Sequence, residues 1–592
     1  MSKAWWANHR KRLGYELKKL KEAGYSYSLQ KEWFKNGGSG LLHLSKVTGD
    51  HAGLELKVFF PDTYPYTRFE IVAPELELEF HHNPFTKTLC LLGRAPENWK
   101  SADTIAGVLA EKLNSVIHSG QSDDGKAVAH LEDEQAEPFS EMYDYVPNFT
   151  ILNDSSIEIP EHIQYGTMRV ALKGNIDKDF TGLILEFCDK NGKTVAQANP
   201  ELLKNHSRTL GFKDTIDATW VRVPQPIKNS NPDEFYQEVR KYLPKKKLSI
   251  KNKKFRGMFV EILGVYFPEE INWRQKGWGW TYCMRASRIT RVKKINSNRI
   301  MIRPGYLGYD DVMARTSFLS EMRNKTVALF GLGCLGAPSA IELAKCGLGR
   351  LRIVDFDYVD PCTLTRWPLG LSAAGKSKPE VLAKFIEENY PYTNIDFKEP
   401  ICLGDVGLIK PKEKNDNDVL ENILNDVDLV YDSTANFNIQ HLLSSLTQEL
   451  NVPYIALDTT YGIWGGQVSR ILPNKTSGCW ECINYHQKDF REGKQALPAI
   501  PIPLSDSSPS GKIQPKGCGS PTYTGAGFDA SEIFNCGVRL AVSTLTEGGK
   551  ISYPSISWDV AIVNLRNEKG EAVLPNWQPF KLTAHPNCPC QK

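Results

Sequence analysis

The sequence predicts a multidomain α/β protein: an α+β domain at the amino terminus, a mixed middle domain, and a parallel sheet covered by helices at the carboxyl terminus. Three observations support this prediction. The chain of 592 residues is longer than one hydrophobic core accommodates. Near the amino terminus, strand-like runs follow a helical pattern. In the last half of the chain, strand and helix patterns alternate. We therefore expect domains at 1–145, 146–310 and 311–592.

The composition is that of an ordinary globular protein, with 41% hydrophobic and 24% charged residues and a formal net charge of +3. Such a small charge gives no basic footprint for nucleic acid, so we expect no nucleic-acid partner. The apolar runs are shorter than the roughly 18–20 residues that cross a bilayer, and the amino terminus lacks the apolar core of a signal peptide. We expect a cytoplasmic protein without a membrane segment.

The first 145 residues predict one amphipathic helix, an antiparallel meander and a second helix. Leu13, Leu17 and Leu20 recur at helical spacing. The runs GLLHLSKV, GLELKVFF and RFEIVA follow, separated by glycine, proline and aspartate turns, as in antiparallel strands. The stretch SADTIAGVLAEKLNSVI then predicts a helix capped by Ser101 or Asp103. The middle segment has alternating runs without a catalytic motif.

A glycine-rich turn in the last domain predicts a phosphate site. The stretch KTVALFGLGCLGAPSAIELAKCGLGRLRIVDFD holds a strand, then Gly331, Gly333 and Gly336 in G-x-G-x-x-G order, then a helix and a second strand that ends at Asp355. This order brings backbone N–H groups and a helix N-terminus to a phosphate. Asp355 lies at the spacing of an acid that binds a ribose hydroxyl.

Positive charge after the second strand favours a triphosphate over a dinucleotide. Beyond Asp357 the chain supplies Arg366, Lys376 and Lys378, the last two at an expected helix start. A triphosphate needs more positive charge than a dinucleotide pyrophosphate, and such cations stabilise the charge that develops in nucleotidyl transfer. Any one of them alone is explained equally well as a surface charge.

The segments GLGCLGAPSA, IVDFDYVD, LTRW, GKSK and YDSTANFN resemble the adenylating domain of ubiquitin-activating enzymes and of bacterial ThiF and MoeB, a Rossmann-like fold. The resemblance extends over 311–592. It implies that the chain binds ATP with magnesium. The positions it implies for this are Gly331, Gly333, Gly336, Asp355, Asp357, Arg366, Lys378, Asp432 and Asn436.

The magnesium motif departs from the family pattern. The family has Asp-x-x-Asp-Asn, whereas this chain has Asp432-Ser433-Thr434-Ala435-Asn436, with alanine in place of the second aspartate. Either Asp432 or another acid coordinates the magnesium ion in place of the missing aspartate, or the phosphates supply most of its ligands.

Two close cysteine pairs predict a metal site. The chain has 13 cysteines, and a disulfide framework is not expected in a reducing cytosol. The pairs Cys479 with Cys482 and Cys588 with Cys590 have the grouping of a tetrahedral thiolate zinc site. The alternative is that the tail cysteines are exposed thiols. The resemblance places structural zinc at the same positions.

The resemblance also implies a nucleophilic cysteine on a loop that crosses the nucleotide site. Cys518 lies between glycines and is followed by Pro521 and an expected helix. Glycine neighbours leave the sulfur accessible, and a nearby helix start lowers a thiol pKa. We expect Cys518 to be the first nucleophile. Cys334 and Cys346 lie in the nucleotide fold, and we expect them to pack there.

Cys90, in the stretch HHNPFTKTLCLLGRAPENW, is either a core residue or a second nucleophile. The stretch FPDTYPY and the spacing from Cys90 to Trp99 resemble a ubiquitin-conjugating domain over 1–130, which implies a reactive Cys90. The family's His-Pro-Asn triplet is altered here to His-His-Asn-Pro. Asn83, within that altered motif, is our candidate to stabilise an oxyanion.

The domain order resembles the bacterial fusion enzymes of CBASS anti-phage operons. That resemblance implies an ATP-dependent ligase-transferase that adenylates the C-terminus of a partner protein, a cyclic-dinucleotide synthase. The acyl group would pass to Cys518, then to Cys90, and finally to a target lysine. It also implies a homodimer through the adenylating domain, a companion deconjugating metalloprotease, and a linker or inactive adenylation-like domain at 146–310. Arg315 and Arg323 are candidates to reach the phosphates across the dimer.

Four alternatives stay open. An activator of a true bacterial ubiquitin-like modifier uses the same chemistry on a different donor. A sulfur-carrier adenylyltransferase, like ThiF or MoeB, predicts that Cys90 is dispensable. A dinucleotide oxidoreductase predicts NAD(P) binding and gives no reason for Cys518. A non-catalytic scaffold predicts no ATP–pyrophosphate exchange.

Overall fold

The computed structural model describes fourteen stretches of the chain, in two compact units. The described residues are 5–30, 41–93, 98–122, 124–128, 135–176, 178–244, 253–255, 258–289, 294–296, 298–404, 415–494, 497–508, 512–513 and 522–591. One unit comprises 1–153, 157–197 and 214–305, and the other comprises 154–156, 198–213 and 306–592. None of the helices in the described stretches has the length and apolar character needed to cross a membrane.

The amino-terminal part of the first unit is an antiparallel sheet with flanking helices. Its elements are α1 (Trp5–Asn8), α2 (Arg10–Glu22), β1 (Tyr25–Leu29), β2 (Leu41–Lys46), β3 (Glu55–Phe59), β4 (Glu70–Val72), β5 (Thr88–Leu89), α4 (Ile105–Gly120), α5 (Gly125–Val128) and the 3-10 helix η2 (Phe139–Met142). The five strands pair in chain order, each antiparallel to the next. The predicted helix and meander are therefore confirmed.

The core of this sheet follows from its apolar periodicity. Leu20 of α2 is fully buried, and Leu13 and Leu17 pack against the same cluster. The predicted helix after the meander is α4, but its predicted caps are wrong. Thr104 is the N-cap, and its side chain accepts a hydrogen bond from Gly107 N. The Asp103 carboxylate instead accepts a hydrogen bond from Lys100 N.

The middle segment is built mainly from strands. Its elements are β6 (Phe149–Asn153), β7 (Tyr165–Asn175), β8 (Asp179–Asp189), β9 (Thr194–Gln197), α6 (Pro200–Asn205), β10 (Asp214–Arg222), α7 (Pro232–Val239), η3 (Arg240–Tyr242), β11 (Lys253–Phe255), β12 (Met258–Asn272), β13 (Gln275–Ile289), β14 (Lys294–Asn296) and β15 (Ile300–Tyr306). Of these, α6 belongs to the second compact unit.

The sheet of the middle segment closes on itself. The strand order runs β11-β12-β10-β7-β8-β6-β15-β13-β14, and β12 also pairs with β13. The long β12–β13 hairpin is antiparallel, as is the β7–β8 hairpin. This topology differs from the alternation of parallel strands and helices in a nucleotide-binding fold. The segment that we expected as a linker or an inactive adenylation-like domain is rich in strands, which pack around a hydrophobic cluster.

The carboxyl-terminal part alternates strands and helices. Its elements are α8 (Tyr309–Met313), η4 (Ala314–Asn324), β16 (Thr326–Phe330), α9 (Gly336–Lys345), β17 (Arg350–Val354), η5 (Pro361–Thr363), η6 (Leu371–Ala373), α10 (Lys378–Asn389), β18 (Asn394–Phe397), α11 (Asp416–Leu424), β19 (Leu429–Asp432), α12 (Phe437–Glu449), β20 (Tyr454–Thr459), η7 (Tyr461–Ile463), β21 (Gly465–Ile471), α13 (Trp480–Arg491), β22 (Lys512–Ile513), β23 (Thr522–Tyr523), α14 (Gly527–Leu545), β24 (Val560–Arg566), β25 (Ala572–Phe580) and η9 (Pro589–Gln591).

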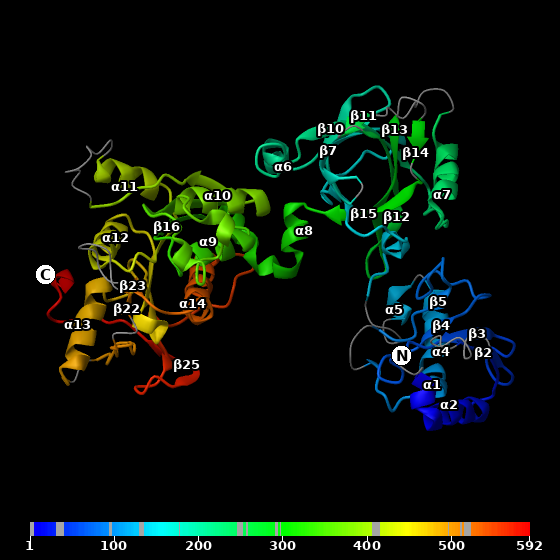
Figure 1. Ribbon diagram of the computed structural model, residues 1–592, viewed down its shortest axis with the longest axis horizontal. Coiled ribbons are helices and arrows are strands. Elements are labelled where there is room, and N and C mark those ends of the chain that lie inside the picture. Colours follow the sequence, from blue (N-terminus) through cyan, green and yellow to red (C-terminus); the bar gives the residue numbers. More distant parts are fainter. Residues whose placement is uncertain are drawn as a thin grey trace. The chain divides into compact units, whose positions relative to one another are not determined.

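Its eight-stranded sheet has the order β18-β17-β16-β19-β20-β21-β24-β25. The strands from β18 to β20 are parallel, as predicted, whereas β21, β24 and β25 add an antiparallel edge. Helices α9, α10 and α14 lie on one side of the strands, and α11, α12 and α13 lie on the other (Figure 1). In open parallel sheets of this kind, ligands bind outside the carboxyl ends of the strands, here those of β16, β17 and β19.

The cap of α4 gives the first testable prediction. Replacing Thr104 with alanine removes the acceptor for Gly107 N and should destabilise α4 by about 1 kcal/mol. Hydrogen exchange of the α4 amides should then speed up about fivefold. Ser101→Ala is the matched control, because Ser101 has the residue type of a cap but does not cap the helix. Equal exchange in both variants would contradict this assignment.

Candidate functional site

The glycine turn between β16 and α9 requires two of its glycines. Gly331 has φ = +84°, a conformation that side chains disfavour. A Cβ on Gly336 would lie 1.9 Å from the carbonyl oxygen of Gly331 and 2.2 Å from Oγ of Ser433. Gly333 has open space around its Cα. The first and third glycines thus allow close backbone approach, and the second leaves room for a ligand.

Asp355, directly after β17, is hydrogen-bonded to this turn. Oδ2 of Asp355 accepts a hydrogen bond from Leu332 N at 2.5 Å, and its Oδ1 accepts one from Asp357 N at 2.8 Å. Trp367 donates its indole N–H to the carbonyl oxygen of Leu332 at 2.8 Å. The turn is therefore held from both sides before any ligand binds.

The predicted cations lie near the same edge of the sheet. Lys378, the first residue of α10, is largely buried, and its Nζ lies 2.6 Å from Oδ2 of Asp357. Arg366 donates to the carbonyl oxygen of Tyr523 at 2.7 Å, and its guanidinium lies over the Tyr523 ring. Asp357 and Lys378 thus form an ion pair, and Arg366 is hydrogen-bonded to the strand β23.

The altered magnesium motif has an inward-facing aspartate. Asp432 is fully buried, and it accepts hydrogen bonds from Thr434 N, Thr434 Oγ1 and Tyr454 Oη at 2.8–2.9 Å. Burial raises the pKa of Asp432 to about 6, although these donors act in the opposite direction. Oδ1 of Asn436 accepts from Asn438 N and Ile439 N, so this side chain caps α12. The assignment of both residues to magnesium stays a prediction.

A second acid near this motif was not predicted from the sequence. Asp458 lies in β20, and its Oδ1 accepts from Nε2 of Gln440 at 2.8 Å. Together with Ala435, it lines a cleft of about 290 Å³. Ala435 occupies the place of the family's second aspartate, and Asp458 comes near it because β19 pairs with β20. No local motif marks it.

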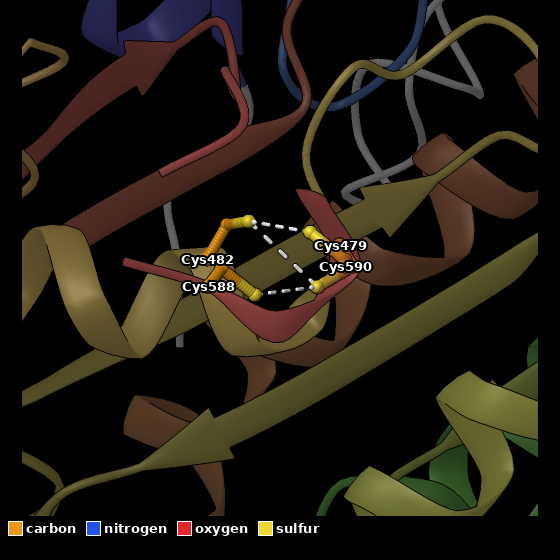
Figure 2. Close-up of side chains that lie close together, drawn as sticks. All are labelled: Cys479, Cys482, Cys588 and Cys590. Carbon is orange, nitrogen blue, oxygen red and sulfur yellow. Dashed lines mark hydrogen bonds between the residues drawn. The ribbon is translucent and has the colours of Figure 1, made fainter. Parts of the chain in front are cut away.

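The four clustered cysteines meet, as their spacing predicts (Figure 2). The ligand atoms of Cys479, Cys482, Cys588 and Cys590 all lie within 4.8 Å of one another. The sulfur–sulfur distances are 3.7 Å for Cys479–Cys482 and 3.5 Å for both Cys479–Cys588 and Cys482–Cys590.

A polar partner next to this cluster suits bound thiolates. His585 donates its backbone N–H to the sulfur of Cys482 at 3.3 Å, and its Nε2 lies 2.9 Å from Oδ2 of Asp489. Four convergent sulfurs with an N–H···S contact fit a tetrahedral zinc ion.

Among the remaining cysteines, Cys518 lies outside the described residues. Cys334 is buried in the glycine turn. Burial raises the pKa of Cys346 to about 11, so this thiol stays protonated at neutral pH. Both of these environments suit packing.

Cys90 is exposed although it follows the short strand β5. Its neighbours Leu89 and Leu91 are buried, so the alternation of the chain turns the thiol outward. The backbone N–H of Cys90 donates to the carbonyl oxygen of His81 at 2.8 Å, which fixes the residue. Cys90 lines a cleft of about 670 Å³. An accessible, fixed thiol is the arrangement that a nucleophile needs.

Asn83 lines the same cleft as Cys90. Its Oδ1 accepts hydrogen bonds from Phe85 N and Thr86 N, both at 2.9 Å, and so shapes the loop before β5. The role of its amide toward an oxyanion stays a prediction.

Two further residues beside Cys90 were not predicted. A ring nitrogen of His81, the sulfur of Cys90 and a carboxylate oxygen of Glu137 all lie within 4.8 Å of one another. Nδ1 of His81 lies 3.0 Å from Oε1 of Glu137, and His81 N donates to Oε2 of Glu137 at 2.7 Å. Glu137 is 47 positions after Cys90, in the acidic stretch LEDEQAEPFSE.

The segment that carries Glu137 is attached to the β12–β13 hairpin. Glu137 N donates to Oε2 of Glu270 at 2.6 Å. Ser140 donates to Glu269 through its backbone N–H at 2.7 Å and through its hydroxyl at 3.0 Å. Burial raises the pKa of Glu269 to about 7, more than the Ser140 donors lower it.

Of the two arginines expected at a dimer, Arg323 has partners within its own unit. It lies 3.6 Å from Glu201 and over the ring of Tyr309. Arg315 is exposed in η4.

Comparison with known families agrees with this architecture. Residues 310–510 match the ThiF family, and residues 34–151 match Prokaryotic E2 family B. The chain is thus a multidomain α/β protein with an E2-like amino-terminal domain and a Rossmann-like carboxyl-terminal domain of the ThiF and MoeB type.

The relatives divide into full-length and partial matches. "Uncharacterized protein y4oA" of Sinorhizobium fredii (strain NBRC 101917 / NGR234) is 28% identical over 605 aligned residues, which cover 99% of this chain and 97% of that protein. "Ubiquitin-like modifier-activating enzyme 5" of Dictyostelium discoideum is 28% identical over 179 residues, covering 28% of this chain and 42% of that protein. The crystal structure of E. coli MccB with ATP has 17% identity and a TM-score of 0.31, covering 48% of this chain and 70% of that one.

The buried carboxyl group of Glu269 predicts a pH dependence. Because its folded pKa lies above its ordinary value of 4.5, the protonated form is favoured in the folded protein. Its contribution to stability is therefore greatest in acid and is lost as the pH rises through about 7, by up to about 3 kcal/mol. Glu269→Gln should remove this slope in urea unfolding followed by tryptophan fluorescence between pH 5 and 8. Glu161→Gln, at an exposed position, is the control. Parallel pH profiles for wild type and Glu269→Gln would refute this.

Proposed function

We propose that this chain uses ATP to activate the carboxyl terminus of a partner protein and passes it as a thioester from Cys518 to Cys90. The observation that carries this proposal is the exposed Cys90 in an E2-like domain, on the same chain as a ThiF-type glycine turn. A carboxylate resists nucleophilic attack, and adenylation gives it a good leaving group. The glycine turn and the start of α9 would hold the phosphates, with Arg366 and Lys378 supplying positive charge.

The residues around Ala435 fit a magnesium site in a modified form. Magnesium would neutralise phosphate charge during adenylation. Asp432 has its oxygens occupied by internal donors, whereas Asp458 lines the cleft beside Ala435. We therefore assign the role of the missing acid to Asp458, in place of Asp432 alone.

The relay divides one difficult acyl transfer into easier steps. The thiolate of Cys518 attacks the acyl-adenylate, a C–S bond forms, and AMP leaves. Cys90 then takes the acyl group by thiol exchange, with little change in bond energy. A lysine amine of a target finally attacks the Cys90 thioester and displaces the Cys90 thiol. Because both thiols belong to one chain, the effective concentration of each at the other is higher than it would be on separate proteins.

The donor we propose is a cyclic-dinucleotide synthase of a CBASS anti-phage operon. We propose that this chain itself works in the cytoplasm as a homodimer formed through its adenylating domain. The principal alternative donor is a bacterial ubiquitin-like modifier, which the partial match to ubiquitin-like modifier-activating enzyme 5 favours. A sulfur-carrier adenylyltransferase is the third candidate, since part of this chain is 28% identical to "Probable adenylyltransferase/sulfurtransferase MoeZ" of Mycobacterium tuberculosis (strain CDC 1551 / Oshkosh) over 171 residues, 29% of this chain and 38% of that protein.

The relay order gives a direct test. With ATP, magnesium and the proteins encoded beside this chain, wild type should form adducts on non-reducing gels that thiols release. Cys518→Ala should lose both adducts, and Cys90→Ala should keep the one on Cys518. Cys362→Ala, at another exposed cysteine, should behave as wild type. A Cys90 adduct that persists without Cys518 would contradict the order, and activity without Cys90 would favour the sulfur-carrier alternative.

The cysteine cluster gives a second test. A zinc ion there would tie the end of the chain to α13 and stabilise this part of the fold. We expect about one zinc per chain by elemental analysis, and its loss in Cys482→Ser, with a lower melting temperature. Cys362→Ser should keep both the metal and the melting temperature. Metal-free protein that melts like wild type would contradict the assignment.

A further inference from the structure

We infer that Glu70 binds the amine that discharges the Cys90 thioester, and that its carboxylate selects a cationic amine such as lysine. Glu70 would be a specificity-determining residue of the last acyl-transfer step, so this role rests on the proposed function of Cys90. The electrostatic effect of Glu70 on the Cys90 thiol does not rest on that function, because it follows from the position of the carboxylate alone.

The pairing of β4 with β5 brings Glu70 to Cys90. The two strands are antiparallel, and Ile71 lies opposite Leu89. One step further along this register, the next two residues are Glu70, which begins β4, and Cys90, which directly follows β5. Directly opposed residues of an antiparallel pair have Cβ atoms roughly 4.5–5.5 Å apart. Glu70 and Cys90 are therefore neighbours across the sheet, although they are far apart in the sequence.

Both side chains face away from the hydrophobic core. Ile71 and Leu89 are buried in the core of the amino-terminal sheet, and successive side chains of a strand alternate between its two faces. Glu70 and Cys90 are both exposed, as this alternation requires. Both line the cleft of about 670 Å³. A molecule in this cleft can thus contact the thiol and the carboxylate together.

The carboxylate of Glu70 has no hydrogen-bond or ion-pair partner among the described residues. The other two carboxylates of the cleft do have partners. Oε1 of Glu137 lies 3.0 Å from Nδ1 of His81, and Oε2 of Glu141 lies 3.2 Å from Nη1 of Arg303. Within the described lining of the cleft, Glu70 is thus the acid whose charge a bound cation would satisfy.

The cleft has an excess of negative charge beside the thiol. Its described lining includes three carboxylates and two guanidinium groups. One of these cations, Arg68, donates to the carbonyl oxygens of Leu92 and Gly93, the latter at 2.8 Å. Arg68 is therefore engaged with the segment that follows Cys90. The field that Glu70 adds at the thiol attracts positively charged reactants and repels negatively charged ones.

The last step of the relay uses such a charge. A lysine amine is protonated at neutral pH. Its ammonium group would bind Glu70, lose one proton to solvent, and attack the thioester carbonyl as the neutral amine. The C–N bond forms, the C–S bond breaks, and a second amine proton passes to the Cys90 sulfur. Glu70 raises the local concentration of the amine and is unchanged at the end.

The electrostatic effect is tested with two methanethiosulfonate reagents, one with a trimethylammonium group and one with a sulfonate group. Their rates of reaction with Cys90 are followed by peptide mass spectrometry. Glu70→Gln should lower the ratio of the cationic to the anionic rate about fivefold, and 1 M salt should reduce this difference. Glu55→Gln is the matched control, because Glu55 is exposed on the neighbouring strand β3 and outside the lining of the cleft. A ratio in Glu70→Gln equal to that of wild type would overturn the inference.

The role toward the amine is tested on full-length Cys518→Ala protein loaded at Cys90 with a synthetic glycyl thioester of 2-mercaptoethanesulfonate. Discharge is compared for N-acetyl-lysine amide, a cation, and for hydroxylamine, which is neutral at pH 7. Glu70→Gln should slow discharge to the lysine amide about fivefold and leave discharge to hydroxylamine unchanged, and Glu70→Asp should keep much of the wild-type rate. Equal slowing with both nucleophiles would show a merely structural role and overturn the inference.

The outcomes separate this inference from the proposed function. The synthetic thioester needs neither ATP nor the donor protein, so a chain that never forms ATP-dependent adducts can still show selection of a cationic amine by Glu70. Conversely, a working relay in which Glu70→Gln discharges to the lysine amide as fast as wild type would refute the role of Glu70 and leave the relay intact. Loss of the cationic preference at the thiol without slower lysine discharge would also refute the role toward the amine.

Discussion

The carboxyl-terminal unit depends on the close approach of three backbone segments at the carboxyl edge of its parallel sheet. The third glycine of the turn packs against the carbonyl oxygen of the first, and Ser433 from the end of β19 closes over both. Any side chain at Gly336 would force these segments apart. Because they meet, α9 starts at the carboxyl edge of the sheet, and Asp355 can hold the amide of Leu332. A glycine turn that leads into a helix start suits a phosphate, which is the role we propose for this turn.

In the amino-terminal unit, the comparable constraint is the attachment of the segment around Glu137. That segment joins two folded parts, and its backbone is held by acids from the β12–β13 hairpin. A carboxylate delivered in this way is more rigid than one on a free loop, because both its backbone and its side chain have partners. The β12–β13 hairpin thus helps to fix the position of Glu137, whose carboxylate lies within 4.8 Å of the Cys90 sulfur.

Much of the fold could be predicted because its determinants are local. Leucine spacing predicted α2, strand-like runs separated by turn residues predicted β2 and β3, and the glycine turn predicted the β16–α9–β17 unit. The close cysteine pairs correctly indicated that four sulfurs meet. The cap of α4 could not be chosen by residue type, since Ser101, Asp103 and Thr104 all suit a cap and only the geometry selects Thr104.

The residues that the sequence did not reveal depend on tertiary contacts. Glu137 reaches Cys90 through the path of the chain after α4, and Asp458 reaches Ala435 through strand pairing. Neither belongs to a motif with the residue it lies beside, so no local pattern marks it. The altered His-His-Asn-Pro stretch was the one local signal near Cys90, and it directed attention to Asn83 rather than to His81.

The central claim, that a nucleotide activates a protein carboxyl terminus on this chain, is tested most directly by exchange of labelled pyrophosphate into ATP. The donor is each neighbouring gene product in turn, with either a free or an amidated last carboxylate. We predict exchange with one free carboxyl terminus and none with its amidated form. Exchange that is insensitive to amidation, or absent with every donor, would contradict the claim.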